Sequence, residues 1–326
     1  MNRRDFLCSA GAAGGLFAVS GLSAGEKSKP DAAETQAVFE RRHPHERLAL
    51  AYQHVDIGLE KPFSVLHISD THLCDVYAHE SAYKREFGRK RTEVFGGRME
   101  EALRDSLAWA KDNVDAVLHT GDMIDFLSEA NCDLVRKYFG QAPNLFSCPG
   151  NHEFQRRLEN EPIRNTFEYN SLSRGELEKA FPKPLHFSST VVGGVNFVFL
   201  EQTYGLVSKE QVELFREEAK KGLPIVLCMH VPFMTERIWR TSRRFWQGCG
   251  RKYTSAALAA ASGDYKRQLS DPVTSAFVAD LKKETLLKAI CAGHLHITVS
   301  DRFSPTVEQY VVGGNFLFHG QEILFT

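Results

Sequence analysis

The chain lacks an excess of charge of either sign. It carries 40 Lys and Arg residues against 41 Asp and Glu residues, which gives a formal net charge of −1 at pH 7. This balance offers no general basic surface, so nucleic-acid binding would need a local patch and nucleic acid is not expected as a partner. With 43% apolar residues in 326, the composition is that of a globular protein, and we expect one large domain.

Cysteine is also scarce, and no CxxC spacing occurs among the seven cysteines. A structural zinc site built on paired cysteines is therefore not indicated. Cys148, Cys228 and Cys291 lie inside or at the end of apolar runs, where a thiol behaves as a small buried hydrophobic group. Disulfides are chemically allowed in an exported protein, but we predict that most of these cysteines are unpaired.

Residues 1–25 have the form of an export signal, with a basic start and an apolar stretch of small residues over 8–24. The pair Arg3-Arg4 followed by Phe6-Leu7 resembles a twin-arginine signal. This predicts export of the folded protein by the bacterial twin-arginine machinery to the periplasm or beyond. Membrane contact is expected only during export or through an uncleaved signal. The alternative is a chance Arg-Arg pair in a general secretory signal.

Residues 26–47 are polar and predict a linker, and 48–326 form the predicted domain. Its first part alternates strands and helices. An edge strand from Leu48 leads by a turn into a strand over 63–68, and helical patterns cover 95–113 and 127–138. Strands over 116–119 and 144–148 follow these patterns in turn. A β-α-β-α-β succession favours a mainly parallel sheet with helices packed on it.

The second half has more β character. Strands over 186–192 and 195–200 flank Gly193-Gly194 as a predicted hairpin, and a strand is expected over 225–229. Predicted helices begin at Ser208, with Gln211 completing a capping box, and at Asp271-Pro272. The last three apolar segments, 307–312, 315–318 and 322–325, predict an antiparallel meander. Two β-containing halves packed face to face, with helices outside, account for both patterns.

Polar residues able to bind a metal follow five apolar, strand-like runs. In chain order they are Asp70-x-His72, Gly121-Asp122, Gly150-Asn151-His152-Glu153, His230 and Gly293-His294-x-His296. The set mixes oxygen and imidazole ligands without a thiolate, which suits Mn, Fe, Zn or Ni. It is too large for one ion. It suits two divalent or trivalent ions that share one carboxylate, an arrangement that stabilises both the attacking and the leaving oxygen of a phosphoryl displacement.

Across all five blocks, from Asp70 to His296, the sequence resembles the calcineurin-like metallophosphoesterase superfamily. The resemblance implies an α/β fold, a four-layer α/β/β/α sandwich of two mixed sheets flanked by helices. It also implies a role for each matching residue. The first metal would be held by Asp70, His72 and His296, the second by Asn151, His230 and His294, and Asp122 would bridge them.

The same resemblance implies a reaction. A metal-bound hydroxide would attack phosphorus, and His152, which is not a ligand, would act as general acid toward the leaving oxygen. The block order is similar to that of class III cyclic-nucleotide phosphodiesterases, which slightly favours a phosphodiesterase. The alternatives are a phosphomonoesterase, an exported nuclease and, less favoured, a non-catalytic binding scaffold.

Several nearby polar residues are interpreted differently. His67, His119 and His186 lie within strand-like runs and are interpreted as satisfied core or face histidines. Glu153 either orients His152 or is a solvated loop carboxylate. Asp125 stands three residues after Asp122, where the purple acid phosphatase subgroup has a tyrosine ligand, and this departure argues against that subgroup.

Substrate choice is expected to lie in two basic and aromatic inserts, 77–98 and 233–267. Arginines there could grip a substrate phosphate, and tryptophans could stack on a base or sugar. The candidates in the second insert are Arg237, Trp239, Arg240, Arg243, Arg244 and Trp246. The alternative is a solvated charged loop pinned by its aromatics. A pocket at the metals would favour a small-molecule phosphate ester, and one continuous basic groove would favour a nuclease.

Overall fold

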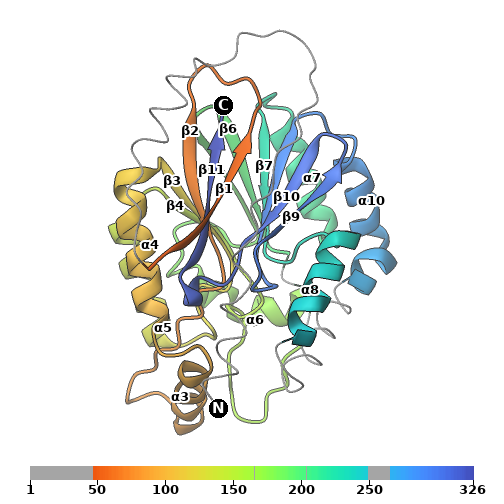
Figure 1. Ribbon diagram of the computed structural model, residues 1–326. Coiled ribbons are helices and arrows are strands. Elements are labelled where there is room, and N and C mark those ends of the chain that lie inside the picture. The colour runs from red at the N-terminus through yellow and green to blue at the C-terminus, as the bar shows by residue number, and fades with distance from the viewer. Residues whose placement is uncertain (1–46, 165, 203, 249–264) are drawn as a thin grey trace.

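The computed structural model describes residues 47–326 with the exception of 165, 203 and 249–264. The predicted export signal and all but the last residue of the predicted linker lie outside the described residues. Part of the second insert, 249–264, also lies outside them. Within the described residues, two sheets pack against each other and helices cover their outer faces (Figure 1).

The first sheet has five strands in the order β1-β11-β2-β3-β4. They are β1 (Ala49–Val55), β11 (His319–Phe325), β2 (Phe63–Ile68), β3 (Ala116–Thr120) and β4 (Leu145–Cys148). The strands β2, β3 and β4 are parallel, as the β-α-β-α-β pattern predicts, and β11 is antiparallel to β2. The first strand lies at the edge, but it pairs with β11 in parallel and not with β2.

Three helices belong to this half: α3 (Ala82–Val94), α4 (Met99–Asn113) and α5 (Glu129–Gln141). The helical pattern predicted over 95–113 begins later, because Gly96 and Gly97 adopt left-handed φ angles of 80° and 74° between α3 and α4. The sequence places α3 within the insert 77–98 and does not predict a helix there. Its charged, largely exposed surface lacks the apolar stripe that predicts a helix packed on a core.

The second sheet has six strands in the order β5-β6-β7-β8-β10-β9. They are β5 (Phe187–Val192), β6 (Val195–Leu200), β7 (Ile225–Cys228), β8 (Leu287–Ala292), β10 (Val307–Val311) and β9 (Val299–Ser304). The four central strands are parallel, and the antiparallel strands β5 and β9 form the two edges. The predicted hairpin at Gly193-Gly194 is confirmed as β5-β6.

Three helices accompany the second sheet: α7 (Lys209–Ala219), α8 (Glu236–Gly248) and α10 (Pro272–Leu281). The helix α6 (Phe167–Leu177) packs Leu177 into the outer core of the first half. The Ser208 side chain caps α7 and forms the predicted capping box with Gln211. Asp271 caps α10 in the same way, with Pro272 at the first helical position. None of the described helices is long and apolar enough to cross a membrane.

The predicted antiparallel meander at the C-terminus is wrong. The strand β10 lies in the second sheet, parallel to β8, while the chain passes through the short 3-10 helix η1 (Asn315–Leu317) and β11 enters the first sheet. The antiparallel partner of β10 is β9, and the sequence does not predict a strand at those residues. Short apolar runs indicate strands, but the pattern within a run does not identify its neighbour.

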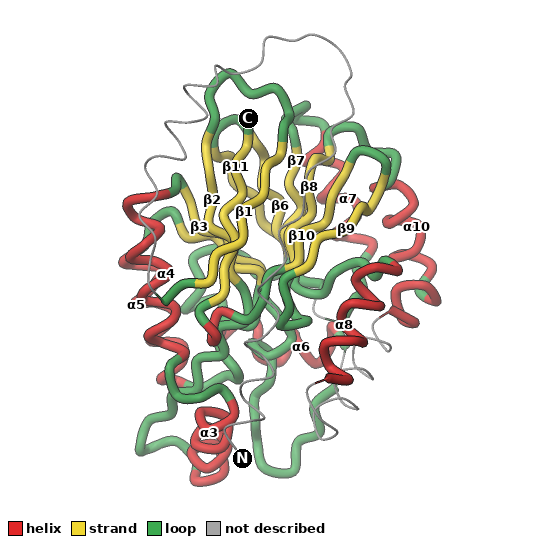
Figure 2. The backbone as a smooth tube through the Cα atoms, in the orientation of Figure 1, coloured by secondary structure: helices red, strands yellow, loops and turns green. Residues whose placement is uncertain are grey.

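Three apolar cores separate four layers (Figure 2). Alternation along β2 is an example, because Val65 faces the second sheet while Leu66 packs toward the helices of the first half. The core between the sheets also contains Phe197, Val226 and Phe325. Together these layers are the predicted α/β/β/α sandwich of two mixed sheets flanked by helices.

Cysteine usage agrees with the sequence interpretation for the described residues. Cys148, Cys228 and Cys291 belong to the core between the sheets, and Cys74 and Cys132 are also buried and unpaired. Burial raises the pKa of the Cys132 thiol to about 11. These thiols therefore act as small apolar groups in the packing.

Candidate metal centre

The five predicted ligand blocks meet at one edge of the two sheets. They follow β2, β3, β4, β7 and β8, which are parallel within their sheets and end at the lower edge in Figure 1. The helices α3, α6 and α8 lie at the same end. Carboxyl ends of parallel strands are a common place for ligand sites in α/β proteins, because the loops there are free of the sheet ladder.

The backbone at this edge adopts an uncommon conformation. Left-handed φ angles occur at Asp70 (55°), His72 (55°), Asp122 (55°), His294 (68°) and His296 (54°). A non-glycine residue in this region costs about 1–3 kcal/mol, and such strain clusters at functional sites. Hydrogen bonds that join different loops hold it in place: Asp70 N donates to Gly121 O, His72 N to Asp122 O, each at 2.9 Å.

Two glycines allow the loops to approach closely. A Cβ on Gly121, whose φ is 93°, would lie 2.6 Å from His230 Nδ1. A Cβ on Gly150 would lie 2.1 Å from Asp122 Oδ1. Any side chain at either position would displace a residue of the centre, which explains why glycine precedes the chemical residue in these two blocks.

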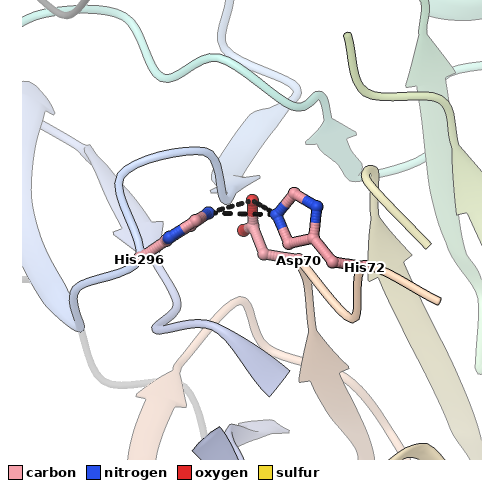
Figure 3. A group of neighbouring side chains, drawn as sticks. All are labelled: Asp70, His72 and His296. Carbon is pink, nitrogen blue, oxygen red and sulfur yellow. Dashed lines mark hydrogen bonds and ion pairs between the residues drawn. The ribbon is translucent and has the colours of Figure 1, made fainter. Parts of the chain in front are cut away.

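The first cluster consists of Asp70, His72 and His296 (Figure 3). The two imidazoles approach the carboxylate from opposite sides, with His296 Nε2 at 3.2 Å and His72 Nε2 at 3.8 Å from Asp70 Oδ1. Their Nε2 atoms lie 3.1 Å apart. Asp70 Oδ1 is buried and accepts no hydrogen bond. Ring nitrogens gathered around an unsatisfied carboxylate oxygen are what a cation site requires.

The second cluster surrounds Asp122. Its Oδ2 lies 3.2 Å from His230 Nε2 and 3.8 Å from His72 Nε2, which places this carboxylate between the two histidine groups. His294 Nδ1 lies 3.2 Å from His230 Nε2. Asn151 Oδ1 is buried without a hydrogen-bond partner. His230 Nδ1 donates to Thr120 O at 2.8 Å, which keeps Nε2 as the ligating atom.

Electrostatics link these groups. Burial alone would lower the pKa of His230, but Asp122 and Asp70 raise it to about 10. The neighbouring histidines in turn hold the pKa of Asp122 well below its usual range, against the effect of burial. In this geometry the proton on His230 balances the buried carboxylates, and a bound cation would replace that proton. The carboxylates, imidazoles and amide oxygen, with no thiol among them, fit two ions that share Asp122.

His152 lies beside the first cluster without belonging to the two metal groups. Its ring is edge-on to that of His72, with centroids 4.8 Å apart. Its Nδ1 lies 2.9 Å from the main-chain oxygen and from the Oδ1 carboxylate oxygen of Asp125. Burial lowers the pKa of His152, but Asp122 and Asp125 outweigh this effect and raise it. The two carboxylates therefore stabilise the imidazolium form, which can donate a proton.

Asp125 is the residue whose role the sequence reading missed. Its fully buried carboxylate is 2.9 Å from His72 Nδ1 as well as from His152 Nδ1, so it orients a metal-cluster histidine and His152 together. Arg91 on α3 forms a two-pronged pair with it at 2.6 and 2.8 Å. The available signal was its position three residues after Asp122 in the same block.

Glu153 neither orients the His152 ring nor lies in solvent, so both sequence interpretations were wrong. It is fully buried and accepts from the backbone N–H groups of Gly150 at 2.8 Å, Met123 at 2.6 Å and Asp122 at 3.1 Å. Burial and Asp122 raise its pKa to about 7. Glu153 therefore joins the β3 and β4 loops and supports the turn that carries Asp122.

The other histidines interpreted as structural lie outside the metal clusters. His67 contacts Thr120 Oγ1 at 2.8 Å and Gln321 Nε2 at 2.7 Å, and His119 contacts Thr71 Oγ1 at 2.9 Å. Burial lowers the pKa of both imidazoles to about 3. His186 Nδ1 lies 3.1 Å from buried Glu201.

Within the described part of the second insert, Glu236–Gly248 form a helix, α8, and not a loop. Ile238 is fully buried and Phe245 packs on the outer core of the second sheet, while the arginines are exposed. Of the six predicted substrate residues, Trp246 approaches the metal clusters, with its ring centroid 6.2 Å from that of His296. An open groove of about 350 Å³ is lined by Glu236, Arg237, Arg240, Thr241 and Arg244.

The two packed mixed sheets carry candidate His and Asp clusters at their shared edge. This arrangement indicates a metal-dependent phosphoester hydrolase. Residues 63–298, well over half of the chain, match the model of the calcineurin-like phosphoesterase family, and the chain belongs to that family. The family uses a dinuclear metal centre. The comparison thereby confirms the superfamily that the five blocks resemble.

Similar solved structures are distant. A dimetal phosphatase from Danio rerio is 15% identical, with a TM-score of 0.48, over 78% of this chain and 88% of that one. A phosphopantetheinyl hydrolase from Mycobacterium tuberculosis is 15% identical, with a TM-score of 0.38, over 78% and 91%. A calcineurin-like phosphoesterase from Bacillus subtilis is 11% identical, with a TM-score of 0.37, over 78% and 82%. No curated protein sequence matches the chain.

Proposed function

We propose that this protein is an exported enzyme that hydrolyses a small-molecule phosphate ester at a centre of two metal ions. The observation that carries this proposal is the position of Asp122, whose Oδ2 lies within 3.8 Å of nitrogens from both histidine groups. A shared carboxylate between two sets of candidate ligands is the arrangement that holds a metal pair.

In this proposal each cluster holds one ion. Asp70, His72 and His296 bind the first, and Asn151, His230 and His294 bind the second, while Asp122 contacts both. The donor set suits Mn, Fe, Zn or Ni. When bound, the two ions would lower the pKa of water and neutralise charge on the phosphate. The loops contribute fixed geometry, because the strained ligand backbone is held by hydrogen bonds between blocks.

His152 would supply the proton that the leaving oxygen needs. Asp125 engages its Nδ1, which leaves Nε2 as the atom that can hold a transferable proton. Asp122 and Asp125 raise the pKa of His152 against the effect of burial, which strengthens the hold of the ring on that proton. The Asp125 carboxylate also contacts His72 Nδ1, so it orients both the proposed general acid His152 and a proposed metal ligand.

We favour a phosphodiester over a phosphomonoester substrate, on the order of the sequence blocks. The helix α8 would form one wall of the substrate site, and the nearness of Trp246 to His296 supports a stacking contact there. The arginine groove on α8 would receive a distal charged part of the substrate. A monoesterase is the second candidate. An exported nuclease would need one continuous basic groove across both inserts.

Export belongs to the same proposal. The Arg3-Arg4 pair and the apolar stretch that follows support transport by the twin-arginine machinery to the periplasm. That route carries folded proteins, which would allow the metals to be loaded before export. Replacing both arginines by lysine and fractionating the cells tests this step. Periplasmic protein from that variant would contradict the twin-arginine route.

The experiment that tests the activity compares bis-p-nitrophenyl phosphate with p-nitrophenyl phosphate, using mature protein reconstituted with Mn²⁺. Metal content is measured on the same sample. Faster cleavage of the diester with two bound ions is the expected result. Faster cleavage of the monoester would overturn the diesterase assignment, and protein that binds no metal would favour the scaffold alternative.

A further inference from the structure

Arg157 lies in the loop that follows the His152 block and has no acidic partner within ion-pair distance among the described residues. Its guanidinium carbon lies 4.0 Å from the centre of the Phe87 ring on α3. One terminal nitrogen donates to Gln155 Oε1. Its Nε is buried and makes no hydrogen bond. The backbone is also strained, with a left-handed φ of 51°.

Two neighbouring arginines, unlike Arg157, each have a carboxylate partner. Arg156, the preceding residue, pairs with Glu161, its Nε lying 3.2 Å from Oε2. Arg91, one helical turn after Phe87 on α3, is paired with Asp125. That carboxylate already accepts from His72 and His152, so it cannot also neutralise Arg157. Among these three arginines, Arg157 is therefore the one without a carboxylate partner within ion-pair distance.

An unbalanced guanidinium in a partly buried position is costly. Burial lowers the pKa of Arg157, with Asp125 acting in the opposite direction. An aromatic ring compensates for part of the lost hydration, but the unmade Nε hydrogen bond remains. A bound anion would restore both the charge balance and the hydrogen bond, and the planar guanidinium matches the oxygens of a phosphate.

The position of Arg157 separates it from the reacting phosphate. Its contacts are with Phe87 and Gln155, not with a residue of the two metal clusters. It is nevertheless close to the site, since Gln155 N donates to His152 O at 3.0 Å and the Phe87 ring contacts that of Phe126, which follows Asp125, with centroids 5.2 Å apart. An anion on Arg157 would lie beside the His152 side of the centre.

We propose that Arg157 binds a second phosphate group of the substrate, distinct from the phosphorus that is attacked. This inference rests on the proposed function and narrows its substrate class to phosphate esters that carry a further phosphate. Arg91 would add a second guanidinium behind the group while continuing to anchor Asp125. Arg157 is thus a specificity-determining residue and leaves the chemical step to the metal centre and His152.

The test measures binding of alkane α,ω-bisphosphonates of increasing chain length to the metal-loaded protein by calorimetry, beside alkyl monophosphonates of the same lengths. At the length that spans the two sites, the bisphosphonate should bind at least about tenfold more tightly than its monophosphonate, because it adds a charge-assisted pair. Arg157→Ala should abolish this advantage and leave monophosphonate binding within about twofold. Arg157→Lys should retain part of it.

Arg156→Ala is the matched control, because it removes a neighbouring arginine that already has a carboxylate partner, and it should keep the full advantage. Equal thermal unfolding midpoints would show that the variants are folded. An advantage that survives Arg157→Ala, or its absence from the native protein at every length, would overturn the proposal. Binding is read without turnover, so a failure to cleave either nitrophenyl ester would contradict the proposed function and not this inference.

Discussion

The strand-end loops and the helix α8 both border the candidate site, but they are built in opposite ways. The loops carry buried and half-buried candidate ligands on a strained backbone, and hydrogen bonds join one block to the next. Helix α8 carries exposed arginines, of which Arg240 pairs with Glu236 on the same helix. The comparison indicates that metal geometry tolerates little change, whereas the surface that would select the substrate can vary without disturbing it.

The loops and α8 also differ in the conformational energy that their residues contribute. A left-handed φ at a non-glycine residue costs about 1–3 kcal/mol, so the five strained ligands persist only because their surroundings determine them together. The exposed Arg240–Glu236 pair is solvent-screened and contributes little to folding. Substitutions of the strained candidate ligands should therefore affect metal binding and turnover together, and substitutions on α8 should affect substrate binding alone.

Asp122→Asn should have the largest effect. The amide removes the charge that both histidine groups face, so both metals should be lost or weakened and turnover abolished. Metal analysis and diester hydrolysis measure this. Asp133→Asn, on the exposed face of α5, is the control and should leave both unchanged. Two fully retained ions in Asp122→Asn would contradict the bridging assignment. They would also contradict the view that the loops tolerate less change than α8.

His152→Ala should separate catalysis from metal binding within the loop region. The metals should remain, and the rate should fall by about 10²–10⁴, which is the usual contribution of a positioned general acid. The loss should grow as the leaving group becomes more basic, because a poor leaving group depends more on protonation. Rates measured over a series of substituted phenyl esters test this, and normal activity would remove the acid role.

Asp125→Asn should have a smaller effect that appears in the pH profile. Asp125 helps to raise the pKa of His152, so its removal should lower that pKa. A general acid acts while protonated, and the fall of kcat at high pH should therefore begin at a lower pH in the variant. A loss of activity with an unshifted profile would assign Asp125 a purely structural role.

Changes on α8 should be the smallest and should not reach the metals. Trp246→Ala should raise KM about fivefold or more if the ring stacks on the substrate, because such a contact is worth at least about 1 kcal/mol per base. Arg240→Ala should alter KM by no more than about fivefold, since exposed pairs contribute about 0–1 kcal/mol. Loss of a metal in either variant would show that the two regions are coupled.

Local signals account for much of the agreement between sequence and structure. The β-α-β pattern of the first half, the hairpin at Gly193-Gly194 and the capping box at Ser208 each depend on a few adjacent residues. Such local signals do not identify the strand partners of the C-terminal segments or the helix α3. The partner of β11 is chosen by packing across the whole sheet, and α3 is anchored to the site partly by Arg91, whose partner Asp125 is distant in sequence.

The sequence by itself determined the donor residues, their order and their place at strand ends, because short-range patterns encode where a strand stops and which chemistry follows it. Only the tertiary structure decided how those donors meet. It placed Asp122 between two histidine groups, joined His72 and His152 through Asp125, and left Arg157 unbalanced beside them. These relations depend on distances between segments far apart in the chain, which strand pairing and sheet packing set and no local pattern contains.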